Sequence, residues 1–153
     1  MKNKILEYNK LIAEFMGVEP TQMHSNKYSY SDMPFFSCTY DTKEEVMKAF
    51  VSYAKYHKSW DWIMPVLFKI KKLQSHLNKE TPLRNGSISW YGGNWIEIEA
   101  NCQMSSDGEN SFPDKDGFKF RTKPFSEYTE IEAIYEAVVE FVKWYNKHIN
   151  NEK

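Results

Sequence analysis

Ser87–Ala100, SISWYGGNWIEIEA, contains two short runs in which apolar and polar residues alternate. Alternation with a period of two is typical of a β-strand with one buried face. Between the runs, Gly92–Asn94 has the composition of a tight turn. The stretch therefore predicts a β-hairpin whose buried face carries the apolar positions Ile88, Trp90, Ile96, Ile98 and Ala100.

A third strand is predicted downstream of the hairpin. In Phe118–Lys123, two Phe residues and a Thr alternate with basic side chains, which again gives one apolar and one charged face. The polar stretch 105–117 is predicted to be the loop that leads to this strand. Upstream, Phe36–Tyr40 also alternates and predicts one more short strand.

Two helices are predicted before the hairpin. Apolar residues at helical spacing predict the first over about 4–16, and Gly17 follows where a left-handed cap belongs. The second is predicted over about 42–56. Its start is marked by a capping box, because Asp41 or Thr42 is followed three residues later by an acidic residue.

Two more helices complete the predicted fold. Ser59 can cap the third, but Pro65 lies too deep inside it to be free of cost, so we expect a kink or a restart there. The fourth is predicted over about 126–148. The fold class is therefore α+β, an antiparallel β-meander of three or more strands with about four helices packed on it. A chain of this length fits a single domain over residues 1–153.

The sequence contains no recognisable catalytic or metal-binding motif. Gly92 and Gly93 lie between two predicted strands and not before a helix, so they predict a turn and not a phosphate-binding loop. The four His residues lack the spacing of a metal site. A metal site or a Cys–His pair could therefore arise only through folding. We predict no catalytic residue, no metal and no cofactor.

Other features bear on where the protein works. Cys38 and Cys102 lie far apart in the sequence and are predicted to be buried free thiols. The N-terminal residues lack the apolar core of a signal peptide. The longest apolar run, Trp62–Phe68, is too short to span a bilayer. We therefore expect a cytoplasmic protein, inside a bacterial host, that does not contact a membrane.

Basic residues gather on two predicted faces, one on the third strand and one on the third helix. A stripe of Lys and Arg can follow phosphates, so these residues are candidate contacts with RNA or another polyanion. The alternative is a solvated strand face on which cross-strand ion pairs with Glu97 and Glu99 balance the cations. The candidates are Lys115, Lys119, Arg121 and Lys123 on the strand, and Lys69, Lys71 and Lys72 on the helix.

Two indole rings flank a carboxylate where the third helix begins. Residues two apart cannot share a helix face, so we expect one Trp in the core and the other exposed or covered by a loop. A purely structural role, core packing plus helix capping, is the alternative. The candidate contacts with a partner or ligand are Trp60, Asp61 and Trp62, together with Trp95 in the hairpin.

Three blocks of the sequence resemble a known group of proteins. The blocks are NKLIAEFMG at 9–17, YHKSWDWIMPV at 56–66 and IYEAVVEFVKWYN at 134–146. They look like those of small uncharacterised accessory proteins of Bacteroidetes phages and prophages. The resemblance implies a context and assigns no catalytic residue. Small phage accessory proteins commonly act by binding, and counter-defence is a frequent role among them.

Three hypotheses of function follow. The leading one is a phage-derived protein that binds and inhibits or modulates a host defence complex, in the first place an RNA-guided (CRISPR) nuclease or its RNA, as an anti-CRISPR protein does. The alternative is a sponge that sequesters a small signalling nucleotide, with an aromatic ring against the base and Lys or Arg against the phosphate. A third hypothesis, a small enzyme, needs a catalytic constellation that only folding assembles.

Overall fold

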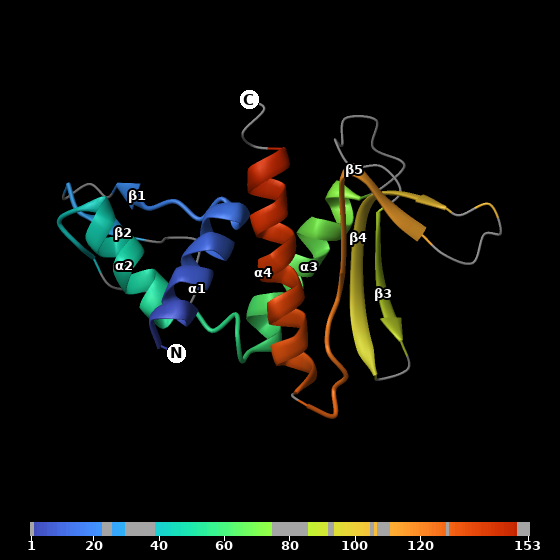
Figure 1. The fold of residues 1–153 in the computed structure, drawn as a ribbon. Coiled ribbons are helices and arrows are strands. Elements are labelled where there is room, and N and C mark those ends of the chain that lie inside the picture. Colours follow the sequence, from blue (N-terminus) through green and yellow to red (C-terminus); the bar gives the residue numbers. More distant parts are fainter. Residues whose placement is uncertain are drawn as a thin grey trace. The chain divides into compact units, whose positions relative to one another are not determined.

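The computed structural model describes residues 2–22, 26–29, 39–74, 86–91, 94–104, 106, 111–127 and 129–149. Its residues group into two compact units, Met1–Lys55 and Tyr56–Lys153, whose helices and strands are drawn in Figure 1. The expectation that the whole chain is a single domain stays a prediction.

The first unit contains two helices and a two-stranded sheet. Helix α1 covers Lys2–Met16 and helix α2 covers Lys43–Tyr53. Strands β1, Thr21–Gln22, and β2, Tyr28–Ser29, pair in antiparallel fashion and were not predicted. Tyr28 also forms an isolated antiparallel bridge with Tyr40. Most of the predicted strand Phe36–Tyr40, including Cys38, lies outside the described residues.

The predicted end of α1 and the predicted start of α2 are confirmed, whereas α2 ends at Tyr53, earlier than the predicted residue 56. Gly17 follows α1 with a φ of 72°, the left-handed conformation that glycine adopts at low cost. Thr42 caps α2 in a capping box with Glu45, in which each side chain accepts a hydrogen bond from the other residue's backbone N–H. Local sequence signals therefore determine where α1 ends and where α2 begins.

A buried amide joins the two helices of this unit. Asn9 on α1 is 1% exposed, and its Nδ2 donates hydrogen bonds to the backbone carbonyl oxygens of Val51 at 3.3 Å and Ala54 at 3.0 Å. These carbonyls belong to the C-terminal end of α2, where backbone acceptors lack helical partners. Asn9 thus satisfies the end of one helix from the side of another.

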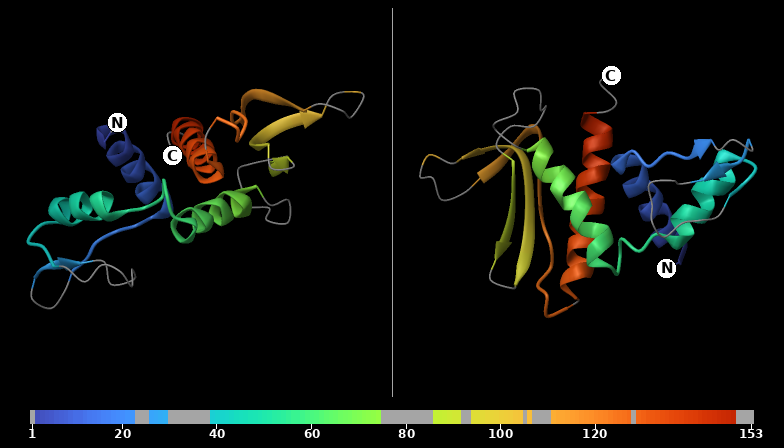
Figure 2. Two further views of the ribbon diagram at one scale, coloured as in Figure 1. Left: turned by 90° about the horizontal axis from the view of Figure 1, so that it is seen from below. Right: turned by 180° about the vertical axis from the view of Figure 1, so that it is seen from behind.

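The second unit is a three-stranded antiparallel meander covered by two helices. Strands β3, Ser87–Tyr91, β4, Trp95–Met104, and β5, Ser111–Arg121, have the order β3-β4-β5. Helices α3, Trp60–Leu73, and α4, Glu130–His148, lie on the same side of this sheet (Figure 2). The predicted α+β class, with a meander and about four helices, is confirmed.

The predicted loop 105–117 is wrong in its second half, because β5 begins at Ser111. Pairing continues beyond Ala100 through a register shift, after which Cys102 pairs with Pro113. Moving two residues along β4 corresponds to five along β5, so β5 carries extra residues there. Asn101 adopts a φ of 52° at this irregularity. The alternation of apolar and polar residues is interrupted at such a shift, so this part of the strand could not be recognised by a period of two.

Pro65 does not make α3 restart, since one helix runs through it. Proline lacks the N–H that would bond to the carbonyl of Asp61 four residues earlier. Asp61 and Pro65 are both exposed, so water can hydrate the freed carbonyl. The position on the solvent side explains why the helix tolerates the proline.

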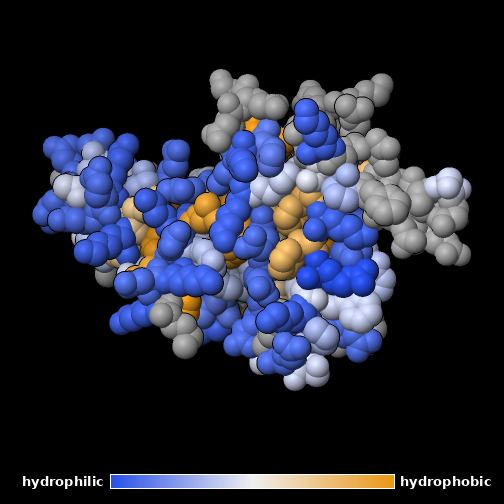
Figure 3. Space-filling model, in the orientation of Figure 1, coloured by the Kyte–Doolittle hydropathy of each residue, from blue (hydrophilic) through white to orange (hydrophobic). Residues whose placement is uncertain are grey.

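The core of the second unit lies between the sheet and the two helices. Helix α4 packs on β4 and β5, and α3 packs against α4. Phe141 meets the ring of Phe118 edge-on at a centroid distance of 5.7 Å. On the face shown in Figure 3, hydrophilic side chains surround small apolar areas, one of them between α4 and the sheet. The fully buried side chains include Ile63, Val66, Ile70, Ile96, Ile98, Ile134, Val138 and Phe141.

Candidate functional site

The two faces of the sheet have different chemistry. Register pairs Ile88 with Ile98 and Ile98 with Phe120, so these apolar residues share the face that the helices cover. The opposite face carries Glu97, paired with Arg121. Candidate residues on β5 and on α3 therefore do not form one surface, because the basic part of β5 lies on the face away from the helices.

Two of the predicted strand cations are ion-paired. Arg121 Nε donates a hydrogen bond of 2.8 Å to Glu97 Oε2, and Lys119 Nζ lies 3.0 Å from Glu99 Oε1. The side chain of Glu97 is only 4% exposed, so its ion pairs with Arg121 and Lys119 take the place of contacts with water. The cross-strand ion pairs considered above are confirmed for both cations.

The two glutamates beside Lys119 stabilise its charged form. Burial by itself lowers its pKa, but the hydrogen bond with Glu99 and the charges of Glu97 and Glu99 outweigh that effect, so the pKa is raised. Arg121 also lies over the ring of Trp95, with its Cζ 5.1 Å from the centroid. These cations are engaged within the sheet, which weakens the case for polyanion contact there.

The remaining strand candidates are dispersed. Lys115 is exposed and lies in the irregular part of β5, between the residues that pair regularly with β4. Lys123 follows β5 and lies 4.0 Å from Glu127. The predicted stripe of four cations is therefore split into separate parts.

The tryptophan motif at the start of α3 has one exposed and one half-buried ring. Trp60 is 42% exposed, and Asp61 is exposed beside it in the first turn. Trp62 packs edge-on against Tyr56, with a centroid distance of 5.2 Å and an interplanar angle of 87°. Ser59 precedes the helix without a side-chain capping bond.

The basic face of α3 is also divided. Lys71 and Lys72 line a groove between α3 and β3, and no acidic partner is found for either among the described residues. Lys69 does not line this groove, and burial lowers its pKa. Of the three predicted helix contacts, the structure brings two to a concave apolar surface.

This groove has a volume of about 1000 Å³ and is the candidate functional site. It forms because α3 packs against α4 while α4 covers β4 and β5, so that among the described elements no helix packs closely on the inner face of β3. Phe68 is 56% exposed and Trp90 is 42% exposed. Large side chains left uncovered together commonly mark a binding surface. The apolar lining consists of Met64, Leu67, Phe68, Ile88 and Trp90.

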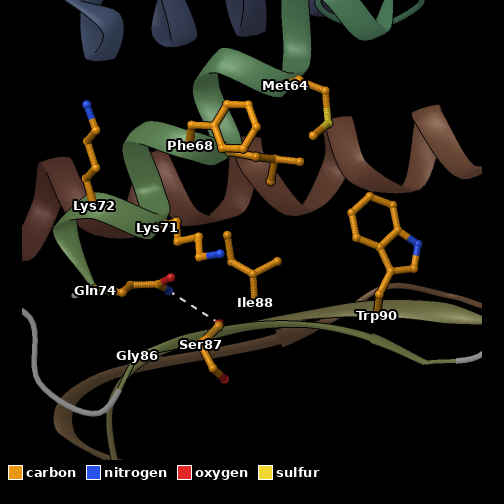
Figure 4. A pocket seen from close by; sticks show the side chains of 10 residues that line it. Met64, Phe68, Lys71, Lys72, Gln74, Gly86, Ser87, Ile88 and Trp90 are labelled. Carbon is orange, nitrogen blue, oxygen red and sulfur yellow. Dashed lines mark hydrogen bonds between the residues drawn. The ribbon is translucent and has the colours of Figure 1, made fainter. Parts of the chain in front are cut away.

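Figure 4 shows how the lining is arranged. Phe68 and Met64 extend from α3 on one side of the groove, and Ile88 extends from β3 on the other. Lys71 extends toward β3 near Ile88, whereas Lys72 points away from the strand. Trp90 stands at the far end, where its Nε1 donates a hydrogen bond to Glu130. The groove thus has a cationic end and an aromatic end with apolar walls between them.

Gln74 closes the cationic end. Its side chain is buried, and Nε2 donates hydrogen bonds to the backbone oxygens of Glu99 at 2.6 Å and Ser87 at 3.4 Å. Its Oε1 is buried without a partner among the described residues. A Cβ on Gly86 would lie 2.5 Å from Gln74 Cγ, so glycine is needed for this close approach. The two residues bring α3 and β3 together at one end only.

The apolar residues of this groove were not predicted as a site from the sequence, although the spacing of those on α3 indicates a shared helix face. Met64, Leu67, Phe68, Lys71 and Lys72 follow the spacing of a single helix face. Phe68 is a large apolar residue outside the buried stripe of Val66 and Ile70. Trp90 was assigned to the buried face, which is correct for its direction, but it is left partly uncovered.

Comparison with known proteins found no relative of this chain. No family model, curated protein or solved structure matches the chain. Within the described residues, no group of His, Cys, Asp or Glu is placed to hold a metal ion. None of the described helices combines the length and the apolar character needed to cross a membrane.

Proposed function

We propose that this protein is a stoichiometric binding protein, phage-derived and active in the host cytoplasm, that inhibits or modulates a host defence complex. Its contact surface for a protein partner is the α3–β3 groove. The observation that carries this proposal is the exposure of Phe68 and Trp90 on a shared apolar groove. A target with RNA-guided nuclease activity remains the leading candidate, as the phage resemblance implies.

Exposed aromatic side chains in a concave site are suited to anchor a protein. Binding energy in protein interfaces concentrates in a few large side chains that become fully desolvated. Lys71 and Lys72 supply charge at the edge of the same groove, where complementary charge adds specificity and speeds association. The ion pairs of Lys119 and Arg121 make the opposite sheet face the weaker candidate for RNA contact.

The test is capture from a Bacteroidetes host lysate with tagged protein, with and without ribonuclease. Phe68→Glu is compared with Trp60→Glu, because both residues are exposed aromatics on α3 but only Phe68 lines the groove. We expect a ribonuclease-resistant partner, at a fixed molar ratio, that Phe68→Glu loses and Trp60→Glu retains. Purified partner should then be inhibited in proportion to added protein.

Other results would contradict the proposal. Loss with Trp60→Glu but not with Phe68→Glu would place the contact at the start of α3. Inhibition at trace amounts of protein would indicate turnover and revive the enzyme hypothesis. Both variants must melt near the wild-type temperature, as expected for exposed side chains.

A second candidate function is sequestration of a small nucleotide. An indole ring and an ammonium group, Trp90 and Lys71, line the same groove, and such groups can stack a base and bind a phosphate. Heat-treated purified protein would then release an intact nucleotide, detected by absorbance and mass spectrometry. A clean supernatant and no thermal shift with a nucleotide panel would exclude it.

A further inference from the structure

We infer that the groove takes an extended segment of a partner protein, which pairs as an additional strand with the edge of β3 that faces away from β4. The segment carries apolar side chains at alternate positions and an acidic side chain at one end. This inference rests on the proposed function, because it describes how the same groove would hold its protein partner.

Strand β3 is placed at the edge of its sheet, where it can accept an additional strand. It is an outer strand in the order β3-β4-β5, and among the described residues its one strand partner is β4. Such a strand has a row of backbone N–H and C=O groups along its other edge that can pair with another chain. Strand addition uses this row for affinity and neighbouring pockets for specificity.

The groove runs along this same strand, β3. Ile88 and Trp90 are two residues apart, so both point to the face that the groove occupies. A segment paired with β3 would direct every second side chain to that face. Those side chains would lie beside Ile88 and Trp90 and beneath Phe68 of α3 (Figure 4). Together they would cover the aromatic surface that the chain itself leaves exposed.

The positive charge at one end of the groove favours a segment with an acidic side chain there. Lys71 extends toward β3 near Ile88, at the end of the groove that Gln74 closes. No acidic partner for Lys71 is found among the described residues. An acidic side chain in register with the start of β3 would meet this ammonium. The buried, unpaired Oε1 of Gln74 offers an acceptor to a donor group at the same end.

These positions define a sequence pattern. Groove-facing residues of the added strand are two apart, so two apolar residues opposite Ile88 and Trp90 are followed at the same spacing by Asp or Glu near Lys71. An antiparallel segment would have the order apolar-x-apolar-x-acidic, and a parallel one the reverse. A helix in the groove would show apolar residues three and four apart instead, and it would leave the edge of β3 unpaired.

The test is selection of a random dodecapeptide library, displayed on phage, against the intact protein. Enriched sequences are then synthesised with a fluorescent label and titrated against wild type, Phe68→Glu, Lys71→Glu and the control Trp60→Glu. We expect enrichment of the alternating pattern, at least tenfold weaker binding by the two groove variants, and unchanged binding by the control. Bound peptide should also slow amide hydrogen exchange in residues 87–91.

Each other outcome overturns the inference. Enriched peptides with helical spacing, or bound peptides that leave exchange in β3 unchanged, would mean that strand addition is not the binding mode. Binding that Lys71→Glu does not weaken would contradict the acidic end of the segment and so the inference as stated. No groove-dependent peptide at all would also reject it. If the peptide selection failed but capture from lysate still depended on Phe68, the inference would be rejected and the proposed function would stand. If neither experiment showed binding that depends on the groove, the inference and the proposed function would both be rejected.

Discussion

Gln74, the C-cap residue of α3, donates a hydrogen bond of 2.6 Å from its side-chain amide to the backbone carbonyl oxygen of Glu99 on β4. Gln74 is buried, so its removal leaves this acceptor without that donor. We expect Gln74→Ala to lower the free energy of unfolding by about 1–3 kcal/mol, measured by urea denaturation. Gly86→Ala should cost less in this background than in wild type, because Gln74 Cγ and Cδ, two of the three atoms crowding the new Cβ, are gone.

Truncation of two adjacent residues on α3 should change stability by very different amounts. Leu67 is 4% exposed and Phe68 is 56% exposed. We expect Leu67→Ala to destabilise the protein by about 2–5 kcal/mol, because it leaves a cavity. Phe68→Ala should change stability by less than about 0.5 kcal/mol. A large loss in melting temperature for Phe68→Ala would show that Phe68 belongs to the core and not to a contact surface.

The ion pair between Arg121 and Glu97 should contribute more to stability than the pair between Lys123 and Glu127. Arg121→Ala leaves the buried carboxylate of Glu97 with Lys119, 3.9 Å away, as its remaining ion-pair partner among the described residues. We expect a loss of about 1–3 kcal/mol. Lys123→Ala removes an exposed pair with Glu127 and should cost at most about 1 kcal/mol. Equal effects in chemical denaturation would contradict the burial of Glu97.

The stability of the second unit should fall in mild acid because of His57. Burial, with a smaller effect from the charge of Lys58, lowers the pKa of His57 below its ordinary value of 6.5. The unfolded chain therefore binds a proton more readily than the folded one, so this contribution to stability is present above pH 6.5 and is lost as pH falls through the lowered pKa. Thermal melts from pH 8 to pH 5 should show a smaller decline for His57→Gln than for wild type.

The elements predicted correctly are those specified by local sequence. Alternation around Ile96 and Ile98 indicated the hairpin, and Thr42 with Glu45 indicated the start of a helix. Register then follows from the pattern, so the cross-strand pairing of Glu97 with Arg121 was foreseeable. The second half of β5 was missed because a register shift interrupts its alternation.

The groove could not be predicted from sequence because it depends on a distance between α3 and β3 that no local pattern encodes. Gln74 and Gly86 lie on either side of a connection of eleven residues, and their close approach arises only in the folded chain. Phe68 was a detectable signal, since it is apolar but lies outside the buried stripe. Its meaning became clear only from the folded structure, in which Trp90 remains 42% exposed.

The left-handed backbone at Asn101 restricts what evolution can place there. Asparagine and glycine adopt a positive φ at modest cost, whereas β-branched residues, the best strand formers, do not. A substitution matrix for strand positions would favour Val or Ile at residue 101, and both would strain the register shift that lets β5 pair beyond Ala100. In a collection of natural variants, this position should therefore be confined to Asn, Gly and Asp while its neighbours drift.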